Sequence, residues 1–392
     1  MQMRLPLQVE RILDILNANG YEAYAVGGCV RDLLLGREPK DWDITTSARP
    51  KQVKSLFPRT VDTGIQHGTI TVLMDGKGYE VTTYRIDGEY EDGRHPSRVE
   101  YTANLLEDLK RRDFTINAMA YRHDVGVVDA FGGREDLEKK SIRCVGDAIE
   151  RFTEDALRIL RAIRFSAQLG FSVEEKTWEA IGVIAPNLAK VSKERIQVEL
   201  SKTLLSGHPE QMGGVFEQGV SGYISPAFAR IPWGQIRIPA SLPARKYVRW
   251  AALLRQTDPE EAVRVLKDLK MDNGTVAKVK TLLAWSGKEV QPEPAPVRRA
   301  MGSMEAEVWD ALLDFNAYGP RIRSLTRQIR EKGDCLDLKH LAVNGQDLID
   351  AGMKPGRELG QILNRLLDMV LECPEKNRKE TLLEIGKIMG KG

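Results

Sequence analysis

The sequence is poor in cysteine and has no long hydrophobic run. Its four cysteines lie far apart in 392 residues, with neither the paired spacing of a zinc site nor the density of a disulfide framework. No segment approaches the roughly 20 consecutive apolar residues that cross a bilayer. The first residues, MQMRLPLQVERILDIL, lack the basic, apolar and small-residue order of a secretory signal. These absences predict a cytoplasmic protein without a disulfide scaffold, a zinc knuckle or a membrane partner.

The chain also lacks a strong excess of either charge. It has 58 Lys and Arg against 56 Asp and Glu, which gives a net charge of +2. The overall composition therefore carries no nucleic-acid signature, and a phosphate-binding surface requires local segregation of charge. A chain of this length exceeds what one hydrophobic core usually supports, so we expect two to four domains of roughly 100 to 200 residues each.

The spacing of apolar residues divides the chain into two regions. Residues 1–145 combine the helical spacing of QVERILDILNANG with strand-like runs such as YEAYAV, GTITVLMDG and GYEVTTYRI. From residue 146 onward, apolar residues recur every three or four positions, and a proline-rich segment at 286–297 marks a further boundary. We predict an α+β region with a small mixed β-sheet, followed by an all-α remainder.

The stretch DWDITT, residues 41–46, places two carboxylates close together. In a β-strand successive side chains point to opposite faces, so Asp41 and Asp43 would share one face while Trp42 takes the other. Oxygen ligands of this kind suit Mg²⁺, which would offset the repulsion between the two aspartates. Glu80, in the strand-like run GYEVTTYR, is the candidate for a third acidic ligand. The competing interpretation is that these acids are solvated strand residues.

A glycine pair precedes the aspartates in YAVGGCVRDLLLG. The pattern predicts a strand, a turn at Gly27 and Gly28, and a helix. The first backbone N–H groups of such a helix can hold a phosphate, and Arg31 adds positive charge. By itself the pair indicates no more than a tight turn that needs glycine's conformational freedom. Together with the two aspartates it is a more specific signal, for a phosphate-bearing ligand beside a metal ion.

The segment EDALRILRAIRF repeats charged residues at every third position. On one helix this spacing would place Asp155, Arg158, Arg161 and Arg164 along a slowly winding polar ridge, beside an apolar stripe that includes Phe165. Taken alone, the pattern is typical of a salt-bridged amphipathic helix.

Several motifs occur in a fixed order along the chain: GGCVRD, DWD, EVTTYR, RRDFTINAMA, DAFGG followed by DL, and EDALRILRAIRF. As an ordered set they resemble the class II tRNA nucleotidyltransferases, which comprise the bacterial CCA-adding enzymes and their poly(A) polymerase relatives. The resemblance is strong over residues 20–205 and looser toward the C-terminus. It implies a nucleotidyltransferase head over 1–145, a helical neck over 146–205, a helical body over 206–297 and a helical, tRNA-binding tail over 298–392.

The resemblance also implies an activity: template-independent addition of CCA to the 3′ end of tRNA from CTP and ATP, with release of pyrophosphate. Asp41 and Asp43, with Glu80 as a third candidate, would hold two Mg²⁺ ions. The basic residue before the RRDFT aspartate, Arg112, would contact the incoming nucleotide, with Asp113 as a weaker candidate. Gly27, Gly28 and Arg31 would hold its phosphates.

In the same interpretation, Asp155 and Arg158 form a protein template for the base. A carboxylate accepts from the exocyclic amine of cytosine or adenine, and an arginine donates to the ring nitrogen beside it. Uracil and guanine present the opposite pattern, and each unpaired buried group costs about 1 to 3 kcal/mol. Arg161 and Arg164 would support that pair or reach the triphosphate.

Two further segments bear on RNA. The segment RIRSLTRQIR contains four arginines that either track RNA phosphates or form a solvated helix face. The charged segment 87–110 lies where, in the family, a loop separates enzymes that complete CCA from those that stop at CC. Its residues GEYEDGRHPS favour the complete enzyme.

Several alternatives stay open. Poly(A) polymerases share the head and neck motifs, and partial enzymes add only CC or only A. A catalytically inactive RNA-binding protein is disfavoured because Asp41, Asp43 and Glu80 are all present. The five histidines include no cluster typical of an appended phosphohydrolase. The choice between monomer and homodimer is open.

Overall fold

The computed structural model describes residues 3–87 and 99–390. The chain forms two compact units, each of which is described by itself. The first comprises Met1–Gly234 and Arg264–Met271, and the second comprises Gln235–Val263 and Asp272–Gly392. The four-part division into head, neck, body and tail stays a prediction.

The first unit is built on a seven-stranded mixed sheet with the strand order β3-β4-β5-β2-β1-β8-β9. Strands β2 and β5 run parallel, and all other neighbours in this sheet are antiparallel. The expected small mixed sheet is thereby confirmed. Its strands are β1 (Ala23–Val26), β2 (Asp43–Thr46), β3 (Thr60–Gly64), β4 (Thr69–Met74), β5 (Lys77–Thr83), β8 (Met119–Arg122) and β9 (Gly126–Asp129).

The hairpin between β4 and β5 shows how local sequence sets the register of the sheet. Met74 pairs with Lys77, so the turn consists of Asp75 and Gly76, and both have positive φ. An Asp-Gly pair in this conformation makes the two-residue turn whose twist matches antiparallel strands. The prediction of paired strands from GTITVLMDG and GYEVTTYRI is confirmed.

Short helices cover the sheet. Helices α1 and α3 pack against its strands, and Leu105 and Leu109 of α4 pack against Tyr24 and Val26 of β1. Helix α1 buries Val9, Ile12, Leu13 and Leu16 at the spacing that the sequence predicted. The helices of this part are α1 (Leu7–Ala18), α2 (Gly28–Leu34), α3 (Pro50–Leu56), α4 (Leu105–Lys110) and α5 (Gly133–Glu138).

The first unit continues into helices that pack around α7 (Leu157–Leu169). Eleven of its thirteen residues are buried, so α7 is a core helix. A parallel strand pair, β10 (Ser141–Ile142) with β11 (Ser172–Val173), also joins the segments before and after α7. The other helices of this part are α6 (Ala148–Glu154), α8 (Glu175–Ile184), α9 (Lys193–Leu204), α10 (Gly213–Glu217), α11 (Ser221–Ile224) and α12 (Pro226–Ala229). A two-stranded sheet pairs β6 (Arg85–Asp87) with β7 (Val99–Tyr101).

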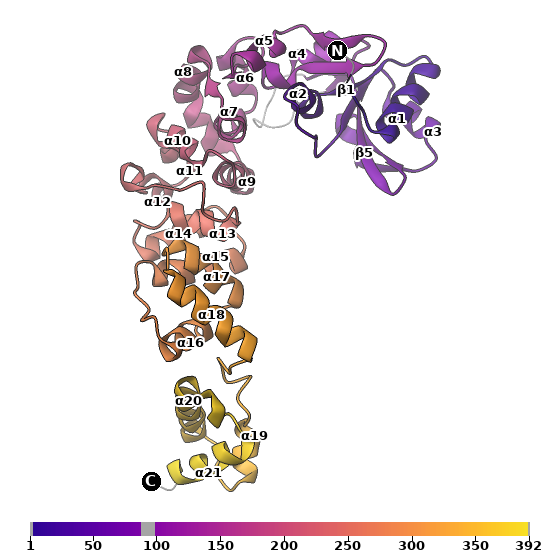
Figure 1. Cartoon of the computed structure of the whole chain (residues 1–392). Helices are drawn as coiled ribbons and strands as arrows, with labels where there is room; N and C mark the ends of the chain where they lie inside the picture. The colour runs from indigo at the N-terminus through magenta and orange to yellow at the C-terminus, as the bar shows by residue number, and fades with distance from the viewer. Residues whose placement is uncertain (1–2, 88–98, 391–392) are drawn as a thin grey trace. The chain divides into compact units, whose positions relative to one another are not determined.

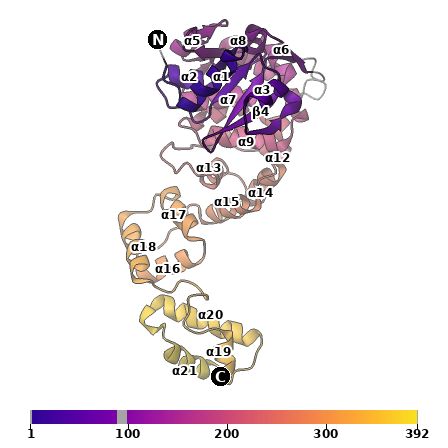
Figure 2. The same ribbon diagram turned by 90° about the vertical axis from the view of Figure 1, so that its right-hand side faces the viewer.

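The second unit is helical throughout its described part (Figures 1 and 2). One apolar cluster joins Leu348, Leu366, Val370 and Leu382 near the C-terminus. Helix α14 (Pro259–Asp268) contributes its first half to the second unit and its second half to the first. The other helices are α13 (Lys246–Leu253), α15 (Asn273–Trp285), α16 (Pro294–Gly302), α17 (Ala306–Phe315), α18 (Pro320–Lys332), α19 (Gly345–Asp350), α20 (Arg357–Glu372) and α21 (Lys379–Met389).

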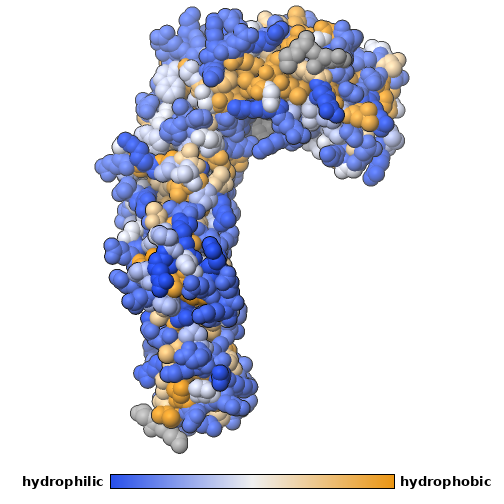
Figure 3. Space-filling model, in the orientation of Figure 1, coloured by the Kyte–Doolittle hydropathy of each residue, from blue (hydrophilic) through white to orange (hydrophobic). Residues whose placement is uncertain are grey.

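The outer surface is largely polar on the face shown in Figure 3, where hydrophilic residues dominate. In the described ranges, no helix has both the length and the apolar character needed to cross a membrane.

Candidate active site

A cleft with a volume of about 580 Å³ opens in the first unit beside the end of β1. Both the sheet region and helix α7 contribute to its wall. Eight of the residues singled out from the sequence line it: Gly27, Gly28, Arg31, Asp41, Asp43, Arg112, Asp113 and Arg161. Four others do not line it: Glu80, Asp155, Arg158 and Arg164. The cleft thus unites the glycine notch, the two aspartates and three arginines.

The glycine notch has the strand–turn–helix form that the sequence predicted. β1 ends at Val26, Gly27 turns the chain with φ of 81°, and α2 starts at Gly28. The Gly27 N–H donates to the Met119 carbonyl at 3.0 Å. A Cβ at Gly27 would lie 3.0 Å from Nη1 of Arg112, so both the backbone conformation and the neighbouring side chain require glycine.

Arg31 is held from two sides at the edge of this notch. Its Nη1 donates to Oδ1 of Asn117 at 2.7 Å, and its Nε and Nη2 donate to Oδ1 of Asp32 at 2.9 and 2.8 Å. Asn117 also lines the cleft. It lies within the quoted motif RRDFTINAMA but was not singled out, because an asparagine carries no charge pattern that a sequence can show.

The strand prediction for Asp41 is wrong, whereas that for Asp43 is confirmed. β2 begins at Asp43, and Asp41 lies in the bend before it, so alternation along a strand does not set its direction. Across the sheet, Asp43 is the register partner of Glu80 in the parallel strand β5. Paired residues on neighbouring strands point to the same face of the sheet. The Glu80 side chain therefore lies on the same face as that of Asp43, although Glu80 does not line the cleft.

These three acids influence one another. The Asp43 residue is partly accessible, yet the surrounding atoms displace enough water to raise the pKa of its carboxyl; Arg112 opposes this rise and Asp41 adds to it. Partial burial likewise raises the pKa of Glu80, and the charges of Asp43 and Asp41 raise it further. The acidic group therefore carries negative charge that Arg112 offsets only in part.

The donor set suits a hard divalent cation. As the side chains lie, no group of three or more His, Cys, Asp or Glu residues in the described ranges forms a complete metal site. Carboxylate oxygens are nevertheless the ligands that Mg²⁺ prefers, and a cation would offset the mutual repulsion that adds to the effect of desolvation on these pKa values. The residues present therefore fit a divalent metal ion.

A buried carboxylate, Asp108 of α4, anchors the arginine pair before Asp113. Nη2 of Arg111 lies 2.7 Å and Nη2 of Arg112 lies 3.5 Å from its oxygens, and Thr45 Oγ1 donates to it at 3.1 Å. Burial alone would raise the pKa of Asp108, but Arg111 and Arg112 lower it below its ordinary value. Sequence reasoning missed this anchor, although its spacing of three and four residues from the arginines is a usable helix signal.

Asp113 and Arg161 form an ion pair at the cleft. Nε and Nη2 of Arg161 donate to Oδ2 of Asp113 at 2.8 and 2.5 Å. Burial would raise the pKa of Asp113, but Arg161 and then Arg158 lower it to about 2. Asp113 therefore stays ionised and holds the Arg161 side chain. The sequence had indicated Asp113 only as a weaker candidate for contact with the nucleotide.

The prediction that Asp155 lies on one helix with the arginines of EDALRILRAIRF is wrong. α6 ends at Glu154 and α7 begins at Leu157, so Asp155 lies between two helices. Its Oδ1 accepts the N–H of Leu157, the first residue of α7, at 3.1 Å, while Oδ2 accepts from Arg195 at 2.8 Å. Arg195 is 40 residues away in α9, and nothing in the local pattern points to it.

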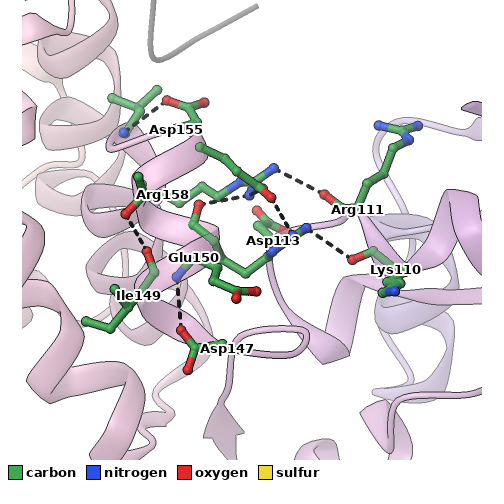
Figure 4. Close-up of polar contacts among 12 residues, drawn as sticks. Lys110, Arg111, Asp113, Asp147, Ile149, Glu150, Asp155 and Arg158 are labelled. Carbon is green, nitrogen blue, oxygen red and sulfur yellow. Dashed lines mark hydrogen bonds and ion pairs between the residues drawn. The ribbon is translucent and has the colours of Figure 1, made fainter. Parts of the chain in front are cut away.

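Arg158 and Arg164 are buried and each pairs with a glutamate, so the salt bridges of the expected amphipathic helix are present but lie largely in the interior. Figure 4 shows Arg158 directed toward the backbone of Arg111, whose carbonyl accepts from Nη2 at 3.1 Å. Nη1 of Arg158 also donates to the Arg151 carbonyl at 2.9 Å and to Glu154 Oε2 at 2.5 Å. Arg164 instead pairs with buried Glu199, at 3.2 Å.

The loop between α2 and β2 adds two cations to the cleft. Arg37 and Lys40, from the loop between α2 and β2, also line the cleft and are exposed. Their place next to DWD in GREPKDWD is a charge signal that the sequence interpretation did not use.

The residues GEYEDGRHPS, on which the loop interpretation mainly depended, lie outside the described residues. The described remainder of 87–110 contains a strand and helix α4 in place of a continuous loop.

Comparison with known proteins covers nearly the whole chain. The family model "Poly A polymerase head domain" matches residues 23–143, and "Probable RNA and SrmB- binding site of polymerase A" matches 170–230. A model for tRNA nucleotidyltransferase domain 2 matches residues 244–385.

Curated relatives and solved structures agree with these matches. The CCA-adding enzyme of Geobacillus thermodenitrificans is 40% identical over 391 residues, covering 95% of this chain and 94% of the relative. The Leuconostoc mesenteroides CCA-adding enzyme is 40% identical over 366 residues, covering 92% and 90%.

Among solved structures, the Bacillus stearothermophilus CCA-adding enzyme in complex with CTP superimposes with a TM-score of 0.84 at 34% identity, over 99% of this chain and 100% of that one. The Thermotoga maritima enzyme complexed with tRNA shares the fold, with a TM-score of 0.64 at 22% identity over 99% and 100% of the two chains. Because identity and coverage are high over the whole length, this chain belongs to the family of CCA-adding enzymes, the nucleotidyltransferases related to poly(A) polymerases.

Proposed function

We propose that this protein adds C, C and A to the 3′ end of tRNA, using CTP and ATP and releasing pyrophosphate. The observation that carries the proposal is the cleft, which brings the glycine notch, Asp41, Asp43 and three arginines together in a chain related throughout to CCA-adding enzymes. Arg31, Arg112 and Arg161 supply charge for a triphosphate, and the notch gives its oxygens room beside the start of α2.

Asp41 and Asp43, with Glu80 behind them, hold the divalent metal that the family requires, and their oxygens match the ligand preference of Mg²⁺. When bound, the metal supplies positive charge that makes the RNA 3′-hydroxyl a better nucleophile and stabilises the leaving pyrophosphate.

The reaction forms a bond between the RNA 3′-oxygen and the α-phosphorus and breaks the bond between the α-phosphorus and the β-bridging oxygen. The 3′-hydroxyl loses its proton to solvent water, and pyrophosphate departs with negative charge that Arg31 and Arg112 help to hold. The ion pair with Asp113 keeps Arg161 oriented at the opposite wall.

Asp155 and Arg158 select the base after an exchange of partners. In this structure the Asp155 oxygens accept from Leu157 and Arg195, and both Nη atoms of Arg158 have acceptors within the protein. An incoming cytosine or adenine, which offers a donor beside an acceptor, can replace part of these contacts, whereas uracil and guanine cannot.

The second unit binds tRNA mainly through backbone charge and shape, and α18 is the candidate surface. Cytoplasmic location and a monomeric or homodimeric state complete the proposal.

The test is product sequencing after the purified protein meets tRNA that ends at the discriminator base, with Mg²⁺ and all four nucleoside triphosphates. Addition of C, C and A followed by a stop is the expected result. A long A tail would identify a poly(A) polymerase, and growth that halts at CC or requires a CC end would identify a partial enzyme. No growth would favour an inactive RNA-binding protein.

A further inference from the structure

Three guanidinium groups surround one aromatic ring at the wall of the cleft. The Cζ atoms of Arg164, Arg31 and Arg161 lie 4.2, 5.3 and 5.4 Å from the centroid of the Phe165 ring. Phe165 is almost fully buried and lines the cleft. Its own orientation is supported by Phe114, which meets it edge-to-face at a centroid distance of 5.7 Å.

The ring joins two parts of the first unit that are far apart in sequence. Arg31 belongs to α2, directly after the glycine notch, whereas Arg161 and Phe165 belong to α7. Arg31 and Arg161 line the cleft together, while Arg164 lies behind them and pairs with Glu199. A single side chain therefore borders arginines from both walls.

An aromatic face and a carboxylate hold an arginine in different ways. A carboxylate accepts hydrogen bonds from the in-plane N–H groups of the guanidinium, and these are the groups that a phosphate needs. An aromatic face attracts the cation from above its plane and leaves the in-plane donors available. A ring is thus suited to orienting an arginine whose task is to bind phosphate.

The local charge balance needs such a contact. Burial lowers the pKa of Arg164 to about 10; Glu199 opposes this fall, and the positive charges of Arg161 and Arg31 add to it. The buried Nε of Arg164 has no hydrogen-bond partner in the described structure. Asp32 and Asn117 together accept one hydrogen bond from each of the three nitrogens of Arg31, which leaves one N–H on each Nη, and Asp113 accepts only from Nε and Nη2 of Arg161.

We propose that Phe165 is a positioning residue that holds Arg31 and Arg161 toward the triphosphate of the incoming nucleotide. The inference rests on the proposed function, which places a nucleoside triphosphate in this cleft. Because the ring acts on phosphate-binding arginines and not on the base, its effect falls equally on CTP and ATP.

The experiment measures binding by calorimetry with Mg²⁺, using CTP, ATP and inorganic tripolyphosphate as three separate ligands. Phe165→Leu keeps an apolar side chain but removes the aromatic face, and Phe165→Tyr restores it. Phe152→Leu is the matched control, because Phe152 of α6 is equally buried and does not line the cleft. Thermal unfolding checks each variant, and Phe165→Met replaces the leucine variant if that one is unfolded.

Phe165→Leu is expected to weaken all three ligands by the same factor, about five- to twentyfold. Phe165→Tyr and Phe152→Leu are expected to bind within about twofold of the wild type, and selection of CTP over UTP is expected to be unchanged. Unaltered binding by Phe165→Leu, or weaker binding of the nucleotides without weaker binding of tripolyphosphate, would overturn the inference. A wild type that binds tripolyphosphate through this ring but never extends tRNA would refute the proposed function while supporting the positioning.

Discussion

At the scale of single residues, the carboxylates of Asp41, Asp43 and Glu80 carry more negative charge than Arg112 offsets. Asp43 of β2 and Glu80 of β5 are paired neighbours on the same face of the sheet, and both have raised pKa values. A folded state that raises the pKa of a carboxyl loses stability as pH rises through that pKa. At neutral pH and without a metal ion, these ionised acids therefore destabilise the fold.

This arrangement predicts opposite effects of Asp43→Asn on activity and on stability. Nucleotide addition should fall at least about a hundredfold, because a metal ligand is lost. In EDTA the unfolding temperature should equal or exceed that of the wild type, because repulsion is removed. Asp124→Asn serves as the control, since Asp124 is outside the cleft. A variant that keeps activity would contradict the metal role.

A second prediction concerns Asp155. If one template reads both bases, Asp155→Ala should lower use of both CTP and ATP and reduce discrimination against UTP and GTP by about tenfold or more. Competition assays with all four nucleotides measure this. Loss of CTP use with ATP selected over GTP as before would disprove a shared template. Loss of the hydrogen bond from the Leu157 N–H also costs stability, so the variant's unfolding must be measured in parallel.

Asp113 gives a pH dependence with a definite sign. Its pKa falls from an ordinary 3.8 to about 2, so its ion pair with Arg161 adds stability above about pH 4 and loses it as pH falls toward 2. The stability advantage of the wild type over Asp113→Asn should therefore narrow by about 2 kcal/mol across that interval. Denaturant titrations at several pH values test this; a constant difference would mean that folding does not lower the pKa of Asp113.

At the scale of elements, the β1–Gly27–α2 unit was predictable, because each of its signals acts over a few residues. The strand, the turn and the helix follow from apolar runs and from a glycine pair. What the pattern did not show is that a Cβ on Gly27 would touch Arg112, 85 positions farther along.

Gly27 and Gly28 consequently differ in their tolerance of alanine. Gly27→Ala should destabilise the fold by about 1 to 3 kcal/mol, because φ of 81° is strained for any other residue. It should also displace Arg112 and raise KM for both nucleotides. Gly28→Ala is the control for stability, since φ there is ordinary and its Cβ would meet only Arg31 Nη2 at 3.7 Å. Chemical denaturation distinguishes the two; equal stabilities would show that the turn relaxes.

Helix α7 shows the limit of pattern reasoning at this scale. Its existence and its arginines were predictable from spacing, but its start and its burial were not. Asp155 falls outside the helix because α6 ends directly before it, and the arginines are covered by elements that the local sequence does not contain. A polar ridge looks the same in sequence whether it meets water or buried carboxylates.

At the scale of the whole molecule, every residue that lines the cleft belongs to the first unit. In α18, Arg323 pairs with Asp314 and Arg330 pairs with Asp310, both in α17. Within the described residues, Arg327 has no ion pair and is exposed. Only part of the basic cluster seen in the sequence is therefore available for RNA phosphates.

Arg327→Glu should accordingly weaken tRNA binding severalfold to tenfold at low salt and less at high salt, with KM for CTP unchanged. Lys139→Glu is the control, because Lys139 is an exposed cation in the first unit that pairs with Glu135. Filter binding at two salt concentrations measures the effect. Equal affinity for the two variants would remove α18 from the tRNA surface.

The sequence by itself determined the fold class, the family, the notch and the identity of the acids, because these depend on short-range periodicity and on motifs in a fixed order. Only the tertiary structure decided which side chains meet. Asp43 pairs with Glu80 across two strands, Asp155 accepts a hydrogen bond from Arg195, and Arg31 lies over the Phe165 ring. All three contacts form because strands and helices distant in sequence pack together. Such contacts depend on the packing of whole elements, and the local pattern of a sequence does not contain that information.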